Sequence, residues 1–173
     1  MTTEYLLDRE VERVLSALMP SNAAVCRVSL HTGLRVSDVL ALRKDQLKSR
    51  FWVRESKTGK AHMVGLPAPL LQELRRIGDQ VPESPWVFAK RGKPEEHRTR
   101  QTVWKDIKRA AAAFRLPQNV GTHTMRKVFA VHLMQKYGDI DRVRRALNHS
   151  NMTTTLIYVM AGKLLDQKRS TRS

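Results

Sequence analysis

Apolar residues near the start of the chain recur at the i, i+3, i+4, i+7 spacing of an amphipathic helix. These residues are Val11, Val14, Leu15 and Leu18. Asp8 can cap this helix at its N-terminus. A second helix is expected over residues 21–32, with Gly33 as its left-handed terminator, and a third over residues 37–42. The chain is therefore predicted to open with three helices.

The pattern changes to short strand-like runs in the middle of the chain. Residues 51–55 and 61–66 flank the turn sequence SKTGK, which predicts a hairpin with Gly59 in the turn and its lysines at the tip. A third strand is expected over residues 86–88. Residues 89–98 are polar and are broken by glycine and proline, so we expect a mobile loop there. These runs predict one three-stranded antiparallel sheet.

Helical spacing returns in the C-terminal half. One helix is expected from Thr99 and another from near Thr122, and Asp139 can cap a short helix after them. Ser150 or Thr153 can cap a last one. The predicted fold class is α+β, mainly α-helical with one small antiparallel sheet, in a single continuous domain.

Charge is the strongest signal in the composition. The chain of 173 residues has 32 Lys plus Arg against 16 Asp plus Glu, a net charge of +16. This predicts a polyanionic partner, nucleic acid by default, and a generic basic surface is the alternative. No apolar run approaches the ~20 residues of a membrane span, no signal peptide is evident, and Cys26 is the single cysteine. We expect a soluble, cytoplasmic protein.

Two clusters carry candidate phosphate-binding groups. Arg35 follows a glycine-marked helix end, where its planar fork could grip a phosphate, although it could equally cap that helix or pair with Asp38. His123 and Arg126 lie at i and i+3 near a helix start and so share a face. Such pairs are also common on solvated helix faces, so neither cluster is decisive alone.

A third candidate is the stretch ALNHSNMTTTLIYVM, in which His149 and Tyr158 stand nine positions apart. By itself this could be a capped helix with a buried aromatic residue. A metal site built on His123 and His149 is not supported, because no HExxH, DxD or CxxC pattern accompanies them. A serine hydrolase is not supported either, because no G-x-S-x-G element follows a strand.

Taken in order, four segments resemble the catalytic domain of tyrosine recombinases, the phage integrase family. They are TGLRVSDVLALR (32–43), ESKTGKAHMVGLP (55–67), THTMRKVFAVHL (122–133) and ALNHSNMTTTLIYV (146–159). The resemblance extends over about residues 5–162. It implies the recombinase catalytic fold without the N-terminal core-binding domain that family members typically carry, so the chain is either a fragment or a natural minimal form.

The resemblance also implies the chemistry. The catalytic residues carried over by motif are Arg35, Lys57, His123, Arg126, His149 and the nucleophile Tyr158, with Asp38 in a supporting position. Tyr158 would attack a DNA phosphate and form a 3′-phosphotyrosine, with His123 as proton acceptor, Lys57 as acid for the 5′ oxygen and His149 as hydrogen-bond donor. The two arginines would stabilise the transition state, so neither a metal nor a cofactor is expected.

Other basic residues are expected to contact DNA. These are Lys60, Lys127, Arg91 and Lys93. Two positions depart from the family pattern, Lys127 in place of a frequent His and Asn148 in place of a frequent Gly, which affects fine geometry and no reacting group. The tail 163–173 is expected to dock on a neighbouring protomer.

The resulting hypothesis is a site-specific recombinase that cleaves and rejoins double-stranded DNA. We expect it to act as a homo-oligomer, a tetramer on DNA, with accessory DNA-bending proteins as possible partners and a location at the nucleoid. Two alternatives stay open. One is a DNA-binding relic or regulator without turnover, and the other is a relaxing enzyme similar to type IB topoisomerases.

Overall fold

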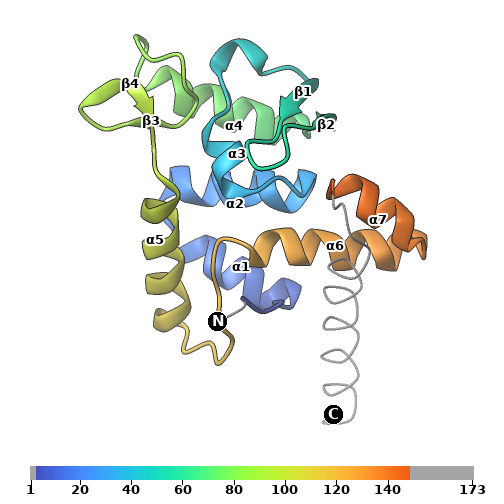
Figure 1. The fold of residues 1–173 in the computed structure, drawn as a ribbon. Helices are drawn as coiled ribbons and strands as arrows, with labels where there is room; N and C mark the ends of the chain where they lie inside the picture. The colour runs from blue at the N-terminus through green and yellow to red at the C-terminus, as the bar shows by residue number, and fades with distance from the viewer. Residues whose placement is uncertain (1–2, 149–173) are drawn as a thin grey trace.

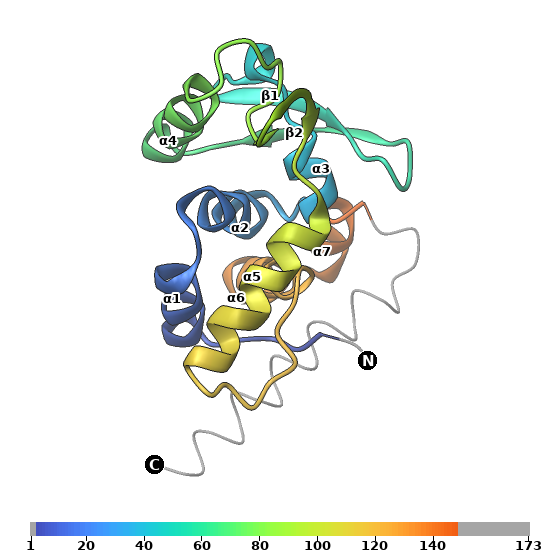
Figure 2. The ribbon, with the colours of Figure 1, turned by 90° about the vertical axis from the view of Figure 1, so that its left-hand side faces the viewer.

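The computed structural model describes residues 3–148, and its elements form two layers (Figures 1 and 2). The upper layer holds two small sheets and the helix over residues 68–79, and the lower layer holds the helices over residues 8–17, 100–113 and 124–137. The helices are α1 (Asp8–Ala17), α2 (Pro20–Thr32), α3 (Val36–Leu40), α4 (Ala68–Asp79), α5 (Arg100–Ala113), α6 (Thr124–Tyr137) and α7 (Ile140–Ala146), with a 3-10 turn at Lys44–Gln46. The strands are β1 (Arg50–Arg54), β2 (Ala61–Gly65), β3 (Ala89–Lys90) and β4 (Lys93–His97).

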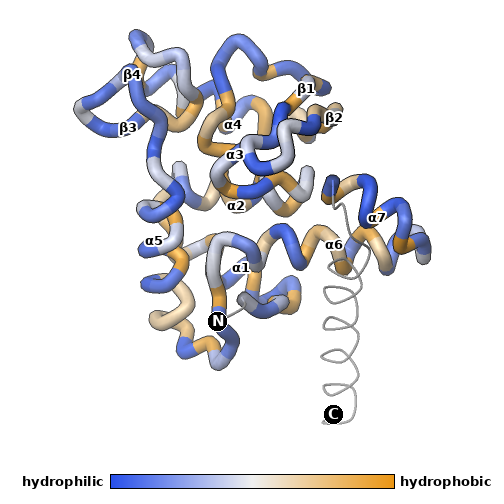
Figure 3. Tube along the Cα trace, viewed as in Figure 1, coloured by the Kyte–Doolittle hydropathy of each residue, from blue (hydrophilic) through white to orange (hydrophobic). Residues whose placement is uncertain are grey.

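Helix α2 is the centre of the molecule. It contacts α1, α3, α4 and α6, and it lies between the two layers in both views (Figures 1 and 2). Its residues Ala23, Ala24, Val25 and Cys26 are all buried, as expected of a helix that is covered on most sides. Helices at the periphery have one buried face instead, and Figure 3 shows apolar and polar residues alternating along α5.

The predicted hairpin is present, and β1 pairs antiparallel with β2 in the register Phe51↔Val64. The prediction of one three-stranded sheet is wrong, because the described residues form two sheets of two strands each. Trp86 makes only an isolated bridge to Arg43, and the N–H of Val87 donates to the carbonyl of Leu42 at 3.0 Å. The expected third strand therefore pairs with the segment after α3.

The segment 89–98, expected to be a loop, forms the β3–β4 hairpin. Gly92 takes a positive φ of 74° at its turn. The lysines at positions 90 and 93 both pair with Glu96, at 2.5 and 3.2 Å. Because these charge pairs form across and along the hairpin, a highly charged sequence is compatible with strand pairing here.

The helix boundaries agree with the sequence except at the first cap. Gly33 ends α2 with φ 71°, and Asp139 caps α7 by accepting from two backbone N–H groups at 2.8 and 3.1 Å. At α1 the cap position is Leu7, and Asp8 instead lies 2.8 Å from His132. The expected cap on Ser150 or Thr153 lies outside the described residues. Across positions 3–148, no helix is long and apolar enough to span a membrane.

Candidate functional site

A recess of about 350 Å³ lies where α3, the β1–β2 turn and the starts of α5 and α6 meet. Its lining residues are Arg35, Val36, Ser37, Lys57, Arg100, Thr122 and His123. Three of the residues that the sequence singled out therefore share one recess, although they come from segments far apart in the chain. One further cation, Arg100, and two hydroxyl residues, Ser37 and Thr122, complete its polar lining.

The position of Arg35 depends on the turn at Gly33. A Cβ at residue 33 would come within 2.6 Å of the ring of Phe129 and 3.1 Å of Leu147, and the positive φ disfavours any other residue. Only Gly33 and Leu34 separate the last residue of α2 from Arg35, which is the N-cap of α3. A glycine is required both by the backbone and by the close approach of α6.

Arg35 is held by two buried carboxylates. Its Nη1 donates to Oε2 of Glu55 and lies 3.8 Å from Oδ2 of Asp38. The Arg35 side chain is 13% exposed, whereas those of Glu55 and Asp38 are 0% and 1% exposed. The arginine therefore presents a small part of its surface to the recess, and its charge is balanced from behind.

Asp38 also fixes the β1–β2 turn. Its Oδ1 accepts from the backbone N–H of Ser56 at 2.9 Å and from the hydroxyl of the same residue at 2.7 Å. Lys57 follows directly and is exposed at the tip of the turn. Gly59 closes the turn with φ 67°, and its N–H donates to the carbonyl of Glu55 at 2.9 Å. The carboxylate of α3 thus holds the turn that carries Lys57 over the recess.

Arg126 is held differently, by main-chain carbonyls. It is 2% exposed, and its two terminal nitrogens donate to the carbonyl oxygens of Gly33 and Leu147. These bonds tie the first turn of α6 to the α2–α3 junction and to the end of α7. Arg126 lies behind the recess and is not among the residues that line it.

His123 is the N-cap of α6 and lines the recess. Partial burial lowers the pKa of His123 below its usual value, and the positive charges of Arg100, Arg126 and Arg35 lower it further. The imidazole is therefore neutral over a wider range of pH than an exposed histidine. A neutral imidazole can accept a proton, which is the role expected of this residue.

Lys127 lies in a different place from the one expected. It is 6% exposed, and its Nζ donates to the carbonyl oxygen of Thr3, which holds the N-terminal segment against α6. Burial lowers the pKa of its ammonium group. A side chain in this position is part of the packing, which argues against the predicted contact with DNA. Lys60, Arg91 and Lys93 are exposed.

Two residues of the site were missed by sequence reasoning. Glu55 follows Phe51 and Val53 at every second position along β1, where side chains point to the same buried face. This spacing could have identified Glu55 as a buried carboxylate from the sequence. Arg100 is the first residue of α5, and nothing in its local sequence distinguishes it from the other arginines.

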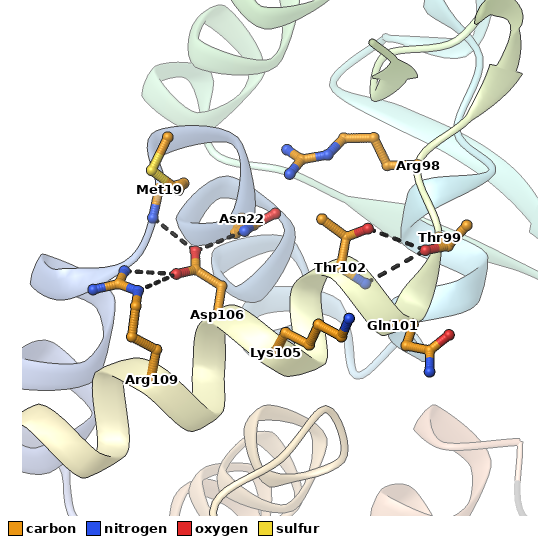
Figure 4. Close-up of a pocket in the computed structure, with 9 residues that line it drawn as sticks. All are labelled: Met19, Asn22, Arg98, Thr99, Gln101, Thr102, Lys105, Asp106 and Arg109. Carbon is orange, nitrogen blue, oxygen red and sulfur yellow. Dashed lines mark hydrogen bonds and ion pairs between the residues drawn. The ribbon is translucent and has the colours of Figure 1, made fainter.

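A larger recess of about 560 Å³ lies beside α5 and is separate from this site (Figure 4). Asp106 stands at its edge and accepts hydrogen bonds from the N–H of Met19 at 2.8 Å, from Asn22 at 2.7 Å and from Arg109 at 3.0 Å. These bonds fasten α5 to the start of α2. None of the predicted catalytic residues lines this recess.

His149 and Tyr158 lie outside the described residues. The last described residue is Asn148, whose side-chain amide donates to Oε1 of Glu55 at 3.4 Å. The chain therefore leaves the described part beside the carboxylate that holds Arg35.

Comparison with known proteins identifies relatives over most of the chain. The model of the phage integrase family matches residues 4–163. A probable integrase/recombinase of Bacillus subtilis, YoeC, is 35% identical over 132 residues, which cover 75% of this chain and 72% of that protein. The tyrosine recombinase XerD of Rhizobium meliloti is 33% identical over 134 residues, covering 73% of this chain and 43% of XerD.

Solved structures show the same fold. The site-specific recombinase XerH, in a post-cleavage complex with its palindromic difH substrate, superimposes with a TM-score of 0.75 and 22% sequence identity. The superposition covers 89% of this chain and 48% of the XerH chain. The chain therefore spans about half the length of several of the recombinases that it resembles.

Proposed function

The chain belongs to the phage integrase family, and we propose that it is the catalytic part of a site-specific DNA recombinase. The observation that carries the proposal is the recess at which Arg35, Lys57 and His123 meet, with Arg126 behind it. Cations, a flexible ammonium group and a neutral imidazole are the groups that transesterification of a phosphodiester needs.

In the proposed reaction, the hydroxyl oxygen of Tyr158 attacks the scissile phosphorus and forms a phosphotyrosine with the 3′ side of the strand. The bond between phosphorus and the 5′ oxygen breaks. His123 takes the proton of the tyrosine, and Lys57 gives a proton to the departing 5′ oxygen. The reverse sequence rejoins a strand, and because bond energy is kept in the phosphotyrosine, no nucleotide cofactor is consumed.

The arginines have separate parts in this reaction. Arg35 reaches the recess and can bind the non-bridging oxygens, whose negative charge grows in the transition state. Arg126 adds a fixed positive potential from behind, and His149 would donate a hydrogen bond to the phosphate. Positive charge provided by preorganised side chains can serve where other phosphoryl-transfer enzymes use metal ions.

The DNA partner follows from charge. A net charge of +16 favours binding to a polyanion through counterion release, and exposed Lys60 and Arg91 are suited to contact phosphates that flank the cleaved one. Exchange between two duplexes breaks four strands, and one chain supplies one tyrosine. We therefore propose a homo-tetramer on DNA, joined through the tail 163–173 and helped by DNA-bending proteins, acting at the nucleoid.

The test is trapping of the covalent intermediate. Nicked duplexes tiled across the DNA that flanks the coding sequence would let the short downstream fragment, which carries the new 5′-hydroxyl, diffuse away after cleavage, so that the adduct accumulates. We expect a protein–DNA adduct with the wild-type chain and none with Tyr158→Phe, at equal DNA affinity. DNA binding without any adduct would point to a regulator. Relaxation of supercoiled plasmid without exchange of strands between duplexes would point to a topoisomerase-like enzyme.

The role of Lys57 has its own test. Lys57→Ala should slow cleavage by about 10²-fold or more, because the 5′ oxygen then leaves without an acid. A substrate with sulfur in place of that oxygen has a leaving group that needs no acid, so it should restore the rate. Lys60→Ala, from the same turn, is the matched control and should weaken binding only. An unrestored rate would remove Lys57 from this role.

A further inference from the structure

The carboxylate of Glu55 accepts hydrogen bonds from three parts of the site. It is wholly buried, with a side chain 0% exposed. Its Oε2 accepts from Nη1 of Arg35 and from the hydroxyl of Thr58 at 3.2 Å, and its Oε1 accepts from the amide of Asn148 at 3.4 Å. One side chain therefore touches the α2–α3 junction, the turn that carries Lys57 and the segment that leads to His149.

We infer that Glu55 is a positioning residue for cleavage. It holds the guanidinium of Arg35 and the turn that carries Lys57 in fixed positions relative to each other. This inference rests on the proposed function. Glu55 does not line the recess, so it acts through the groups it binds.

Two features separate this role from that of Asp38. Asp38 binds the backbone and hydroxyl of Ser56 and lies 3.8 Å from Arg35, beyond hydrogen-bond range. Glu55 has the direct bond to the guanidinium. Asp38 therefore fixes the base of the turn, whereas Glu55 fixes the direction in which Arg35 points.

The placement has a chemical reason. A guanidinium bound by one carboxylate keeps donors on its other side in a fixed plane, and a planar fork binds two phosphate oxygens only when it is correctly oriented. A displacement of 1 Å in such a group costs about 10²-fold in rate. A glutamine at this position keeps the shape and one acceptor but loses the charge-assisted bond.

The experiment compares Glu55→Gln with Glu73→Gln. Glu73 also pairs with an arginine, Arg27 at 2.8 Å, but on the surface and away from the recess, so it is a matched control. The first measurement needs no catalysis. In NMR spectra of the free protein, rotation of the Arg35 guanidinium should become faster in Glu55→Gln and stay slow in Glu73→Gln. Unchanged rotation in Glu55→Gln would overturn the inference.

The second measurement is single-turnover cleavage by folded protein. Glu55→Gln should lower the rate constant by about 10²-fold with less than a threefold change in the Kd for DNA, because Arg35 still carries its charge. In an Arg35→Lys background the same substitution should change the rate less than about threefold. A Glu55→Gln variant that has a lower Tm but cleaves at the wild-type rate would show a purely structural role.

The outcomes also separate this inference from the proposed function. If the wild-type chain forms no adduct on any substrate, the proposed function fails. The NMR comparison still decides whether Glu55 orients Arg35.

Discussion

The two arginines of the site are held in opposite ways. Arg35 is bound by a buried carboxylate with a second one nearby, and Arg126 is bound by the main-chain carbonyls of Gly33 and Leu147. The first arrangement balances the charge of the arginine and fixes its direction, whereas the second ties the start of α6 to the backbone of two other segments. In the proposed reaction, Arg35 would then supply geometry at the phosphate, and Arg126 would join the elements around it.

The largest effect on stability is expected from breaking the ion pair between Arg35 and Glu55. Arg35→Gln should lower the free energy of unfolding by about 3–5 kcal/mol, because it leaves Glu55 buried without its cation. The double variant Arg35→Gln with Glu55→Gln should recover most of this loss without recovering cleavage. Urea denaturation at neutral pH measures both. A single variant as stable as wild type would contradict a buried ionic pair.

The corresponding substitution at the second arginine is Arg126→Gln. We expect a loss of about 3 kcal/mol, since two hydrogen bonds from a charged donor are replaced by weaker ones, and a loss of about 10²–10³-fold in cleavage rate. Gly33 and Leu147 accept through backbone carbonyls, so a change of the Leu147 side chain should not restore these two bonds. Recovery through a side-chain change would break the distinction between the two arginines.

Gly33 is adjacent to both arginines, because its carbonyl accepts from Arg126 and Arg35 follows two residues later. Gly33→Ala should cost about 2 kcal/mol, through the strain of a positive φ and the clash with Phe129. Gly138→Ala is the control, because it shares the positive φ but has no atom within 4 Å of an added Cβ. Thermal unfolding of both variants isolates the cost of the close approach. Equal losses of stability in the two variants would mean that the ring of Phe129 moves aside at no cost in free energy.

The smallest expected effect concerns His123. Burial and the nearby positive charges lower the pKa of His123, so the native state binds a proton less readily than the unfolded chain does. Its contribution to stability is therefore complete above about pH 6.5 and is lost as pH falls below that value. Arg100→Ala should raise the pKa of His123, because it removes one of these charges. NMR titration of the imidazole in both proteins checks the direction.

The helices were predictable because their apolar spacing and caps are local. Gly33 and Asp139 mark the ends of their helices in the sequence as they do in the structure. The third strand was not predictable, because the pairing partner of Trp86 is decided by how the segment after α3 packs. Periodicity identifies a strand-like run, and it does not identify what that run lies beside.

The candidate site was predictable only in part. The motifs identified Arg35, Lys57 and His123, which share one recess in the structure, and their catalytic roles stay predictions. They did not distinguish Lys127, whose burial against Thr3 is a tertiary contact between residues 124 positions apart. They also missed Glu55, although the alternation along β1 pointed its carboxylate inward. Tertiary contacts decide which charged side chains face the recess and which support it.

The most direct test of the central claim is the identity of the residue that joins DNA. Trapped protein–DNA adduct would be digested with nuclease and protease, and the peptide that carries the remaining nucleotide would be sequenced by mass spectrometry. We predict a 3′-phosphonucleotide on Tyr158, with no label on Tyr5 or Tyr137. A linkage at another residue, or cleaved DNA without any linkage, would contradict a phosphotyrosine mechanism at this recess.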